Sequence, residues 1–187
     1  ESKTEIRGDI KTVRCGFIGA GNYGSRVLIP AFKAAGAELD TVVSAGGVSA
    51  LHHGRKNGFE RASTSVKDVL SSPLINTVVI VTQHNLHASQ VRDALLAEKN
   101  VFVEKPLALS QAEIGEIEAL YKQDRTSARL MVGFNRRFSP LVNQMKRLCD
   151  DIKAPKSFIF TMNVGAIPPD HWTQGRLIGG GRIIGEA

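Results

Sequence analysis

The sequence predicts an α/β fold, a doubly wound parallel sheet followed by the beginning of a second α/β domain. Short apolar runs alternate with helical patterns from residue 12 to about residue 133, and such alternation is typical of parallel sheets. The run Thr77–Val81 is continuous and mostly β-branched, as in a central strand covered on both faces. A glycine-rich turn follows the first apolar run directly. With 42% hydrophobic residues among 187, the chain can build a real core.

Each repeat of the pattern predicts one strand and one helix. The predicted strands cover residues 13–18, 39–44, 77–81, 100–103 and 130–133, and the helices cover 23–35, 48–57, 66–70, 87–98 and a segment opening at Ser110. Glu113 stands three residues after Ser110, which is the spacing of a capping box. Pro30 lies inside the first helix and is expected to kink or restart it, because its ring clashes with the preceding turn.

The pattern changes after Gly133, where we place a domain boundary. The predicted organisation is a lead-in at 1–11, a first α/β domain at 12–133 and the truncated start of a C-terminal α/β domain at 134–187. That last part should hold a helix at 140–148, a long strand at 156–164 and a loop rich in Gly and Pro at 165–181. These elements are too few to close a core. The Ile-rich end is expected to start a further buried element, so the chain is interpreted as a segment of a longer polypeptide.

The net charge and the composition limit the kinds of partner that we expect for this chain. The net charge is +6, but the basic residues are spread along the chain and form no nucleic-acid motif, so no nucleic-acid partner is expected. No apolar stretch approaches the roughly 18 residues of a spanning helix, and residues 1–11 carry no secretory signal. We therefore expect a cytoplasmic protein with no membrane partner. Two cysteines indicate no disulfide framework, and no metal site is predicted.

The glycine-rich turn is the strongest functional signal. It reads Gly19-Ala20-Gly21-Asn22-Tyr23-Gly24, a G-x-G-x-x-G motif between a strand and a helix. In a Rossmann domain the first glycine permits the tight turn and the second lets a pyrophosphate approach the backbone. The third lets helix and strand pack closely, with the helix N-terminus facing the phosphates. The alternative is a glycine turn that binds nothing.

The end of the second predicted strand bears on the choice between NAD and NADP. An Asp or Glu there usually binds the ribose 2′-hydroxyl of NAD, but this chain has Ser44. A serine tolerates a 2′-phosphate, and Arg55 or Lys56 could reach it, which favours NADP slightly. Alternatively, Ser44 only caps the next turn and both cofactors bind.

Two further polar stretches follow predicted strands, at the edge where such sheets bind ligands. The first is Thr82-Gln83-His84-Asn85-Leu86-His87, and the second is Glu104-Lys105-Pro106. Lys105 could act as a proton donor or an electrostatic stabiliser beside a reacting oxygen, with Glu104 holding Lys105 or the cofactor ribose. The alternative is a charged strand end before a turn.

Four motifs together resemble the glucose–fructose oxidoreductase/inositol dehydrogenase (Gfo/Idh/MocA) family. They are Gly16–Gly24, Thr82–His87, Val101–Leu107 and Gly-Phe-Asn-Arg-Arg-Phe at 133–138, and the resemblance covers about residues 12–187. It implies an N-terminal Rossmann domain and a C-terminal domain whose open sheet often makes oligomer contacts. It also implies hydride transfer between NAD or NADP and a sugar, cyclitol or related carbonyl compound, by a parent enzyme that is a homo-oligomer.

The resemblance also implies roles for individual residues. Lys105 would lie beside the nicotinamide and substrate as the catalytic residue, and Arg136 and Trp172 would contact substrate. The family's Thr-Pro-Asn-x-x-His is altered here, because Gln83 replaces Pro and His84 replaces Asn. The expected cofactor-binding residues are Gly19, Gly21, Asn22, Tyr23, Gly24, Ser44, Thr82, His84, His87, Glu104 and Pro106.

The family's catalytic His follows a glycine run such as Gly179-Gly180-Gly181 by several residues, and the chain ends at Ala187 before that position. This segment alone is therefore expected to bind dinucleotide and turn over little. The glycine run and the ending Arg-Ile-Ile-Gly-Glu-Ala also resemble bacterial proteins in which this module follows an alcohol-dehydrogenase-like module. Two alternatives stay open, a non-redox sensor or scaffold module and an NAD-dependent glycosidase of the same family.

Overall fold

The computed structural model describes residues 12–161, 163 and 165–186, and a six-stranded sheet organises them. The strands are β1 (Arg14–Ile18), β2 (Glu38–Val43), β3 (Arg61–Ser63), β4 (Thr77–Ile80), β5 (Asn100–Glu104) and β6 (Leu130–Gly133). All neighbours are parallel, in the order β3-β2-β1-β4-β5-β6. The chain therefore reverses its winding between β1 and β4, which is where doubly wound sheets bind ligands.

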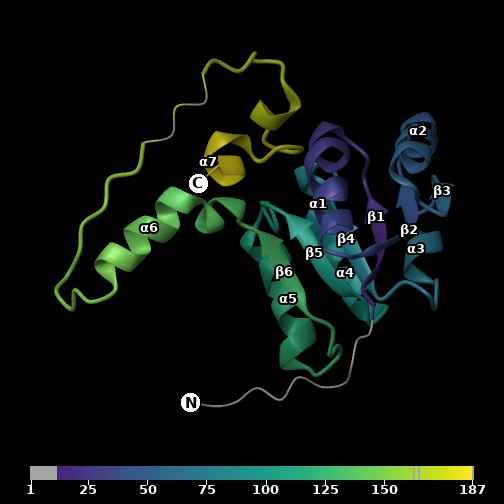
Figure 1. Ribbon diagram of the computed structural model, residues 1–187, viewed down its shortest axis with the longest axis horizontal. Coiled ribbons are helices and arrows are strands. Elements are labelled where there is room, and N and C mark those ends of the chain that lie inside the picture. Colours follow the sequence, from purple (N-terminus) through teal and green to yellow (C-terminus); the bar gives the residue numbers. More distant parts are fainter. Residues whose placement is uncertain (1–11, 162, 164, 187) are drawn as a thin grey trace.

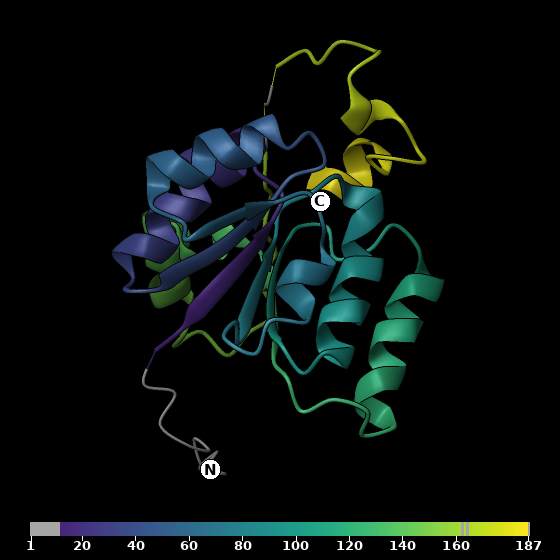
Figure 2. The ribbon, with the colours of Figure 1, turned by 90° about the vertical axis from the view of Figure 1, so that its right-hand side faces the viewer.

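Helices cover both faces of the sheet. The main helices are α1 (Ile29–Ala34), α2 (Val48–Asn57), α3 (Lys67–Leu70), α4 (His84–Leu96), α5 (Gln111–Lys122), α6 (Pro140–Cys149) and α7 (Gly181–Glu186), with short turns η1 (Gly24–Leu28), η2 (Asn135–Phe138) and η3 (Trp172–Gln174). Helices α1 and α2 lie on one face, and α3, α4 and α5 on the other (Figures 1 and 2). The C-terminal segment with η3 and α7 lies above the carboxyl ends of the strands (Figure 2). The predicted doubly wound Rossmann architecture is confirmed.

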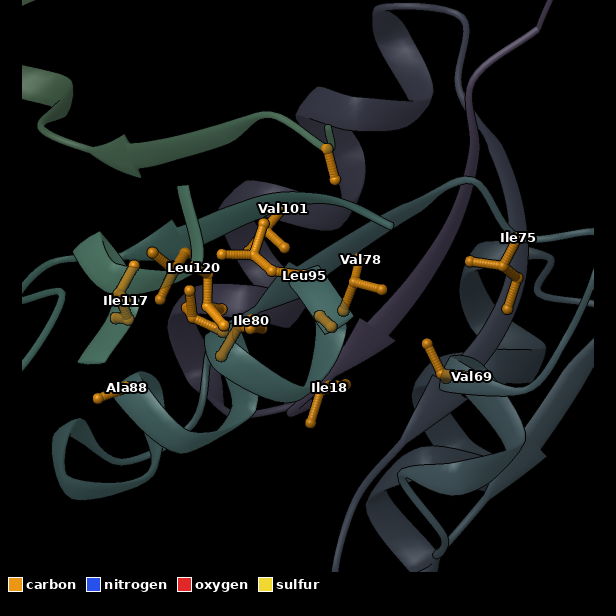
Figure 3. Close-up of a cluster of buried hydrophobic side chains, with 14 of the residues drawn as sticks. Ile18, Val69, Ile75, Val78, Ile80, Ala88, Leu95, Val101, Ile117 and Leu120 are labelled. Carbon is orange, nitrogen blue, oxygen red and sulfur yellow. The ribbon is translucent and has the colours of Figure 1, made fainter. Parts of the chain in front are cut away.

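Each face has its own apolar core, because the strand residues alternate between the two. On the α4 and α5 side, Ile80 and Leu95 are fully buried beside Ile117 (Figure 3). On the α1 side, the Phe17 ring meets the rings of Phe32 and Phe59 edge-on, each at 5.5 Å between centroids. The sheet is thus packed on both faces, so the carboxyl ends of its strands hold the residues of a site in defined positions.

The first helix begins with one π-helical turn and continues as an α-helix from Ile29. The Ile29 N–H bonds to the Gly24 carbonyl, five residues back, and Pro30 occupies the first turn of α1. Proline at a helix start loses no hydrogen bond. At Pro30 the helix therefore changes from π to α geometry without a break, and the predicted capping box of Ser110 and Glu113 is confirmed.

Several element boundaries differ from expectation. Helix α4 begins at His84 rather than His87, so His84 belongs to the helix and not to the loop before it. Strand β3 was not predicted, because Arg61–Ser63 is three residues long and contains no apolar run. It forms as the edge strand beside β2, where backbone pairing outweighs its weak local preference.

The strand expected at 156–164 is wrong for the residues that the structure describes. Residues 156–161 and 163 form no strand, and the Ile159 side chain is 95% exposed. A strand needs a neighbour for its backbone groups, and no strand pairs with this segment in the described part of the chain. The Ile-rich end forms α7, yet Ile183 is 82% exposed, so it is not the buried element expected.

An ion cluster in β2 was not anticipated. The Asp40 side chain is fully buried and accepts hydrogen bonds from Arg14 Nε at 2.7 Å, Arg61 at 2.6 Å and the Thr41 hydroxyl at 2.6 Å. Burial alone raises the pKa of Asp40, but the bonds from Arg61, Thr41 and Arg14 outweigh it, so the pKa lies below its ordinary value. The carboxylate is therefore ionised and ties β1, β2 and β3 together.

Candidate functional site

A cavity of about 810 Å³ opens at the carboxyl ends of the strands, beside the switch point between β1 and β4. Every predicted site residue except Pro106 lines it. These residues are Gly19, Gly21, Asn22, Tyr23, Gly24, Ser44, Thr82, His84, His87, Glu104, Lys105, Arg136 and Trp172. The volume lies within the range of small-molecule and cofactor sites.

The glycine loop has the geometry that its motif predicts. Gly19 has φ +104° and donates its N–H to the Val43 carbonyl at 2.8 Å, and a Cβ on Gly19 would lie 2.5 Å from the Val81 carbonyl oxygen. Only glycine fits there. A Cβ on Gly21 would meet nothing within 4 Å, so at this position the loop leaves open space against the cavity. That space fits a pyrophosphate approaching the backbone.

Tyr23 connects the glycine loop to the segment after the sheet. Its hydroxyl accepts a hydrogen bond from the Asn135 amide at 2.8 Å, across 112 residues of sequence. Asn135 lines the cavity but was not predicted, because nothing in its local sequence marks it as a partner of Tyr23. The contact places η2, and with it Arg136, at the cavity.

The β2 end of the cavity carries no charge. The Ser44 hydroxyl lies 2.7 Å from that of Ser49 in the first turn of α2. Arg55 and Lys56 stand in the last turn of the same helix, about 9 Å further along its axis from Ser49 at 1.5 Å per residue. Neither residue lines the cavity, and their reach to a 2′-phosphate beside Ser44 stays a prediction. Thr64, which follows β3, also lines this end and was missed together with that strand.

Residues that follow β4 line the cavity and are held in place by hydrogen bonds. The Thr82 hydroxyl donates to the Gln90 side-chain oxygen at 2.7 Å. His87 is fully buried, with Nδ1 2.7 Å from the Pro106 carbonyl and Nε2 3.2 Å from that of Thr82. Burial lowers the pKa of His87 despite these carbonyls, so the ring is neutral and has one N–H to donate. The shorter distance favours Nδ1–H donating to Pro106, which fixes the turn after Lys105.

Glu104 brings a buried carboxyl to the cavity wall. Its side chain is 8% exposed, and Oε1 is buried without a hydrogen-bond partner. Gly133 pairs with it across β5 and β6, and a Cβ there would lie 2.7 Å from Oε1. Gly133 therefore makes room for the carboxyl. Burial raises the pKa of Glu104, against the lowering effect of Lys105.

The C-terminal segment closes the far side of the cavity. Lys105 Nζ donates to the Gly185 carbonyl of α7. His84 Nδ1 bonds to the Gly179 carbonyl at 2.8 Å, and the Trp172 ring meets the His84 ring edge-on at 4.8 Å. Residues of the C-terminal segment thus lie against His84 and Lys105.

The cavity suits a ligand that places its phosphates at the glycine loop and its other end at Lys105.

In the described part of the chain, no group of three or more His, Cys, Asp or Glu side chains could hold a metal ion. No described helix is both long enough and apolar enough to span a membrane.

A glycine loop between β1 and the first helix, opening on a cavity at the switch point of this sheet, defines a dinucleotide-binding Rossmann protein. The family model described as "Oxidoreductase family, NAD-binding Rossmann fold" matches residues 13–134. The chain belongs to this Gfo/Idh/MocA oxidoreductase family, whose cofactor is NAD or NADP.

Individual relatives agree with this assignment. The chain is 34% identical over 164 residues to a scyllo-inositol 2-dehydrogenase (NAD(+)) of Bacillus subtilis, covering 84% of this chain and 47% of that one. It is similar to a crystal structure of scyllo-inositol dehydrogenase from Lactobacillus casei with NAD(H) and scyllo-inositol, with TM-score 0.66 and 28% identity over 74% of this chain and 41% of that chain. A 3-ketoreductase structure from Actinomadura kijaniata with NADP shares the fold at TM-score 0.77 and 22% identity, covering 93% of this chain and 54% of that chain.

Proposed function

We propose that this chain is the cofactor-binding part of an NAD(P)-dependent oxidoreductase acting on a sugar, cyclitol or related polyol or carbonyl compound. The observation that carries the proposal is the open glycine loop and Lys105 in one cavity. The chain spans about half the length of the relatives named above. We further propose a domain boundary at 134, a cytoplasmic location and a homo-oligomeric parent enzyme.

The residues along the cavity have different roles in this proposal, according to their chemistry. The nicotinamide cofactor, when bound, supplies or accepts the hydride. The glycine loop and the N-terminus of the first helix hold the pyrophosphate through backbone N–H groups. Ser44 lies at the adenosine-ribose end, and Glu104 lies at the nicotinamide end. Lys105 stabilises negative charge that develops on the substrate oxygen, and Arg136 and Trp172 contact the substrate.

Gly21→Ala tests whether the glycine loop is a working site. The methyl group meets nothing within 4 Å in the protein itself, so thermal stability should stay unchanged. It occupies the space that the pyrophosphate needs, so NADH and NADPH affinity should fall by roughly tenfold or more, about 1.4 kcal/mol. Calorimetric titration of Gly21→Ala and of the wild-type chain checks this, and equal affinity in the two would mean that the dinucleotide does not bind at this loop.

The uncharged β2 end predicts that NADH and NADPH bind with affinities within about tenfold of each other, since no charge near Ser44 discriminates between them. Ser44→Asp should then weaken NADPH by about tenfold more than NADH, because the carboxylate repels the 2′-phosphate. Parallel titrations measure both ratios. Ser49→Ala controls for the lost hydroxyl pair. If Ser44→Asp weakens both cofactors equally, Ser44 does not lie at the ribose.

A further inference from the structure

One segment of the chain, residues 172–185, is fastened to the cavity at the start of α4. His84 opens that helix, and its Nδ1 bonds to the Gly179 carbonyl at 2.8 Å across 95 residues of sequence. The next residue, Asn85, donates its backbone N–H to the Ile178 carbonyl at 3.0 Å. Orphan N–H groups at a helix start need such acceptors. Two consecutive carbonyls of the segment therefore meet two consecutive residues of α4.

The His84 ring adds a packing contact to this hydrogen bond. Its centroid lies 4.8 Å from the Trp172 ring at an angle of 75°, an edge-to-face geometry that aromatic rings prefer. A Cβ on Gly185 would lie 3.4 Å from His84 Cε1, so α7 also approaches the ring closely. The imidazole thus packs against Trp172 at one end of the segment and lies close to Gly185 at the other.

The glycines of the segment allow it to pack this tightly. A Cβ on Gly179 would lie 2.4 Å from Thr173 Cα, and a Cβ on Gly180, whose φ is +77°, would lie 2.6 Å from the Leu109 side chain. Larger residues at these positions do not fit. The backbone path from Gly179 to Gly185 is therefore defined by contacts, and it delivers the Gly185 carbonyl to Lys105 Nζ.

We propose that His84 is a positioning residue for the catalytic end of the cavity. It holds residues 178–185 against α4, and thereby sets the Gly185 carbonyl beside Lys105 and keeps Trp172 in the cavity wall. An asparagine at this position retains an amide donor for the Gly179 carbonyl but has no ring to pack against Trp172. The histidine supplies both contacts. The consequence for the reaction rests on the proposed function, whereas the docking of the segment does not.

Trp172 is the only tryptophan in the chain, so its fluorescence reports the docking directly. In His84→Ala, we expect emission to shift to longer wavelength and acrylamide quenching to rise, because the indole loses its ring partner. His84→Asn should show a smaller change. His171→Ala is the matched control, since the exposed His171 ring also neighbours Trp172, at 5.9 Å, whereas its hydrogen bonds to the Thr173 hydroxyl and backbone N–H stay within the η3 region.

Far-ultraviolet circular dichroism and thermal unfolding of the same variants establish that each is folded. Unchanged Trp172 emission and quenching in a folded His84→Ala would overturn the proposal. The proposal would also be overturned if His171→Ala changed the Trp172 emission and quenching as much as His84→Ala does. The loss of either neighbouring imidazole would then have the same effect, and His84 would have no particular role in docking the segment.

A second measurement separates this proposal from the cofactor assignment. If NADH binds, energy transfer from Trp172 to the bound dihydronicotinamide should be strong in the wild-type chain and weaker in His84→Ala, with NADH affinity by calorimetry less affected. Energy transfer that is unchanged in His84→Ala counts against His84. No NADH binding in the wild-type chain would contradict the proposed function, and the Trp172 emission and quenching would still decide the role of His84.

Discussion

Gly19→Ala is expected to destabilise the chain severely and to abolish dinucleotide binding. Its φ of +104° is a conformation that alanine rarely adopts, and the new Cβ would lie 2.5 Å from the Val81 carbonyl oxygen and 3.2 Å from the Thr82 nitrogen. Both neighbours are backbone atoms of the segment following β4, so no side chain can rotate away. The strain alone costs about 1–3 kcal/mol, and the clash between β1 and β4 adds to it.

Urea unfolding of Gly19→Ala beside the wild-type chain measures this loss. Gly115→Ala is the matched control, because Gly115 lies inside α5 and a Cβ there meets nothing within 4 Å. That control should gain about 0.5–1 kcal/mol, since alanine favours a helix interior over glycine. A Gly19→Ala chain with wild-type stability and affinity would contradict the geometry of the loop.

Arg14→Met is expected to lower the free energy of unfolding by several times the loss seen for an exposed ion pair, because it removes one partner of a buried carboxylate. Arg14 contacts the fully buried Asp40, and also Glu38 and Glu60 at the surface. The variant leaves the Asp40 carboxylate with fewer donors in a buried position. Arg92→Met removes the exposed pairs with Asp93 and Glu116, and it should change stability by only about 0–1 kcal/mol. Similar losses of unfolding free energy in both variants would mean that the ion pair with the buried Asp40 stabilises the fold no more than the exposed pairs do.

The same cluster sets a pH dependence whose sign follows from the lowered pKa of Asp40. The carboxylate contributes stability above its unfolded pKa of about 3.9, and this contribution disappears as the pH falls through the lower folded pKa. Unfolding free energies measured between neutral and acid pH should therefore fall less steeply in Asp40→Asn than in the wild-type chain. Equal acid slopes would mean that the fold does not lower the pKa of Asp40.

Features that depend on near neighbours in the chain follow from the amino-acid sequence alone. The Ser110 capping box, the turn at Gly19 and the change of helix geometry at Pro30 each involve residues within a few positions of one another. The apolar runs also sufficed for five of the six strands, because a strand buried on both faces must be apolar along its whole length. Together these features predicted the sheet and the edge at which the site lies.

Features that need a distant partner in the sequence appear only in the folded structure. Strand β3 exists because β2 offers it backbone groups, whereas residues 156–161 have a better strand sequence and no neighbouring strand among the described residues. Tyr23 and His84 find their partners 112 and 95 residues away. Asp40 looks like any surface acid in the sequence, and its burial follows from Arg14 and Arg61 arriving on adjacent strands. Local patterns carry no information on such pairs, since their energies arise only when the folded sheet brings the partners together.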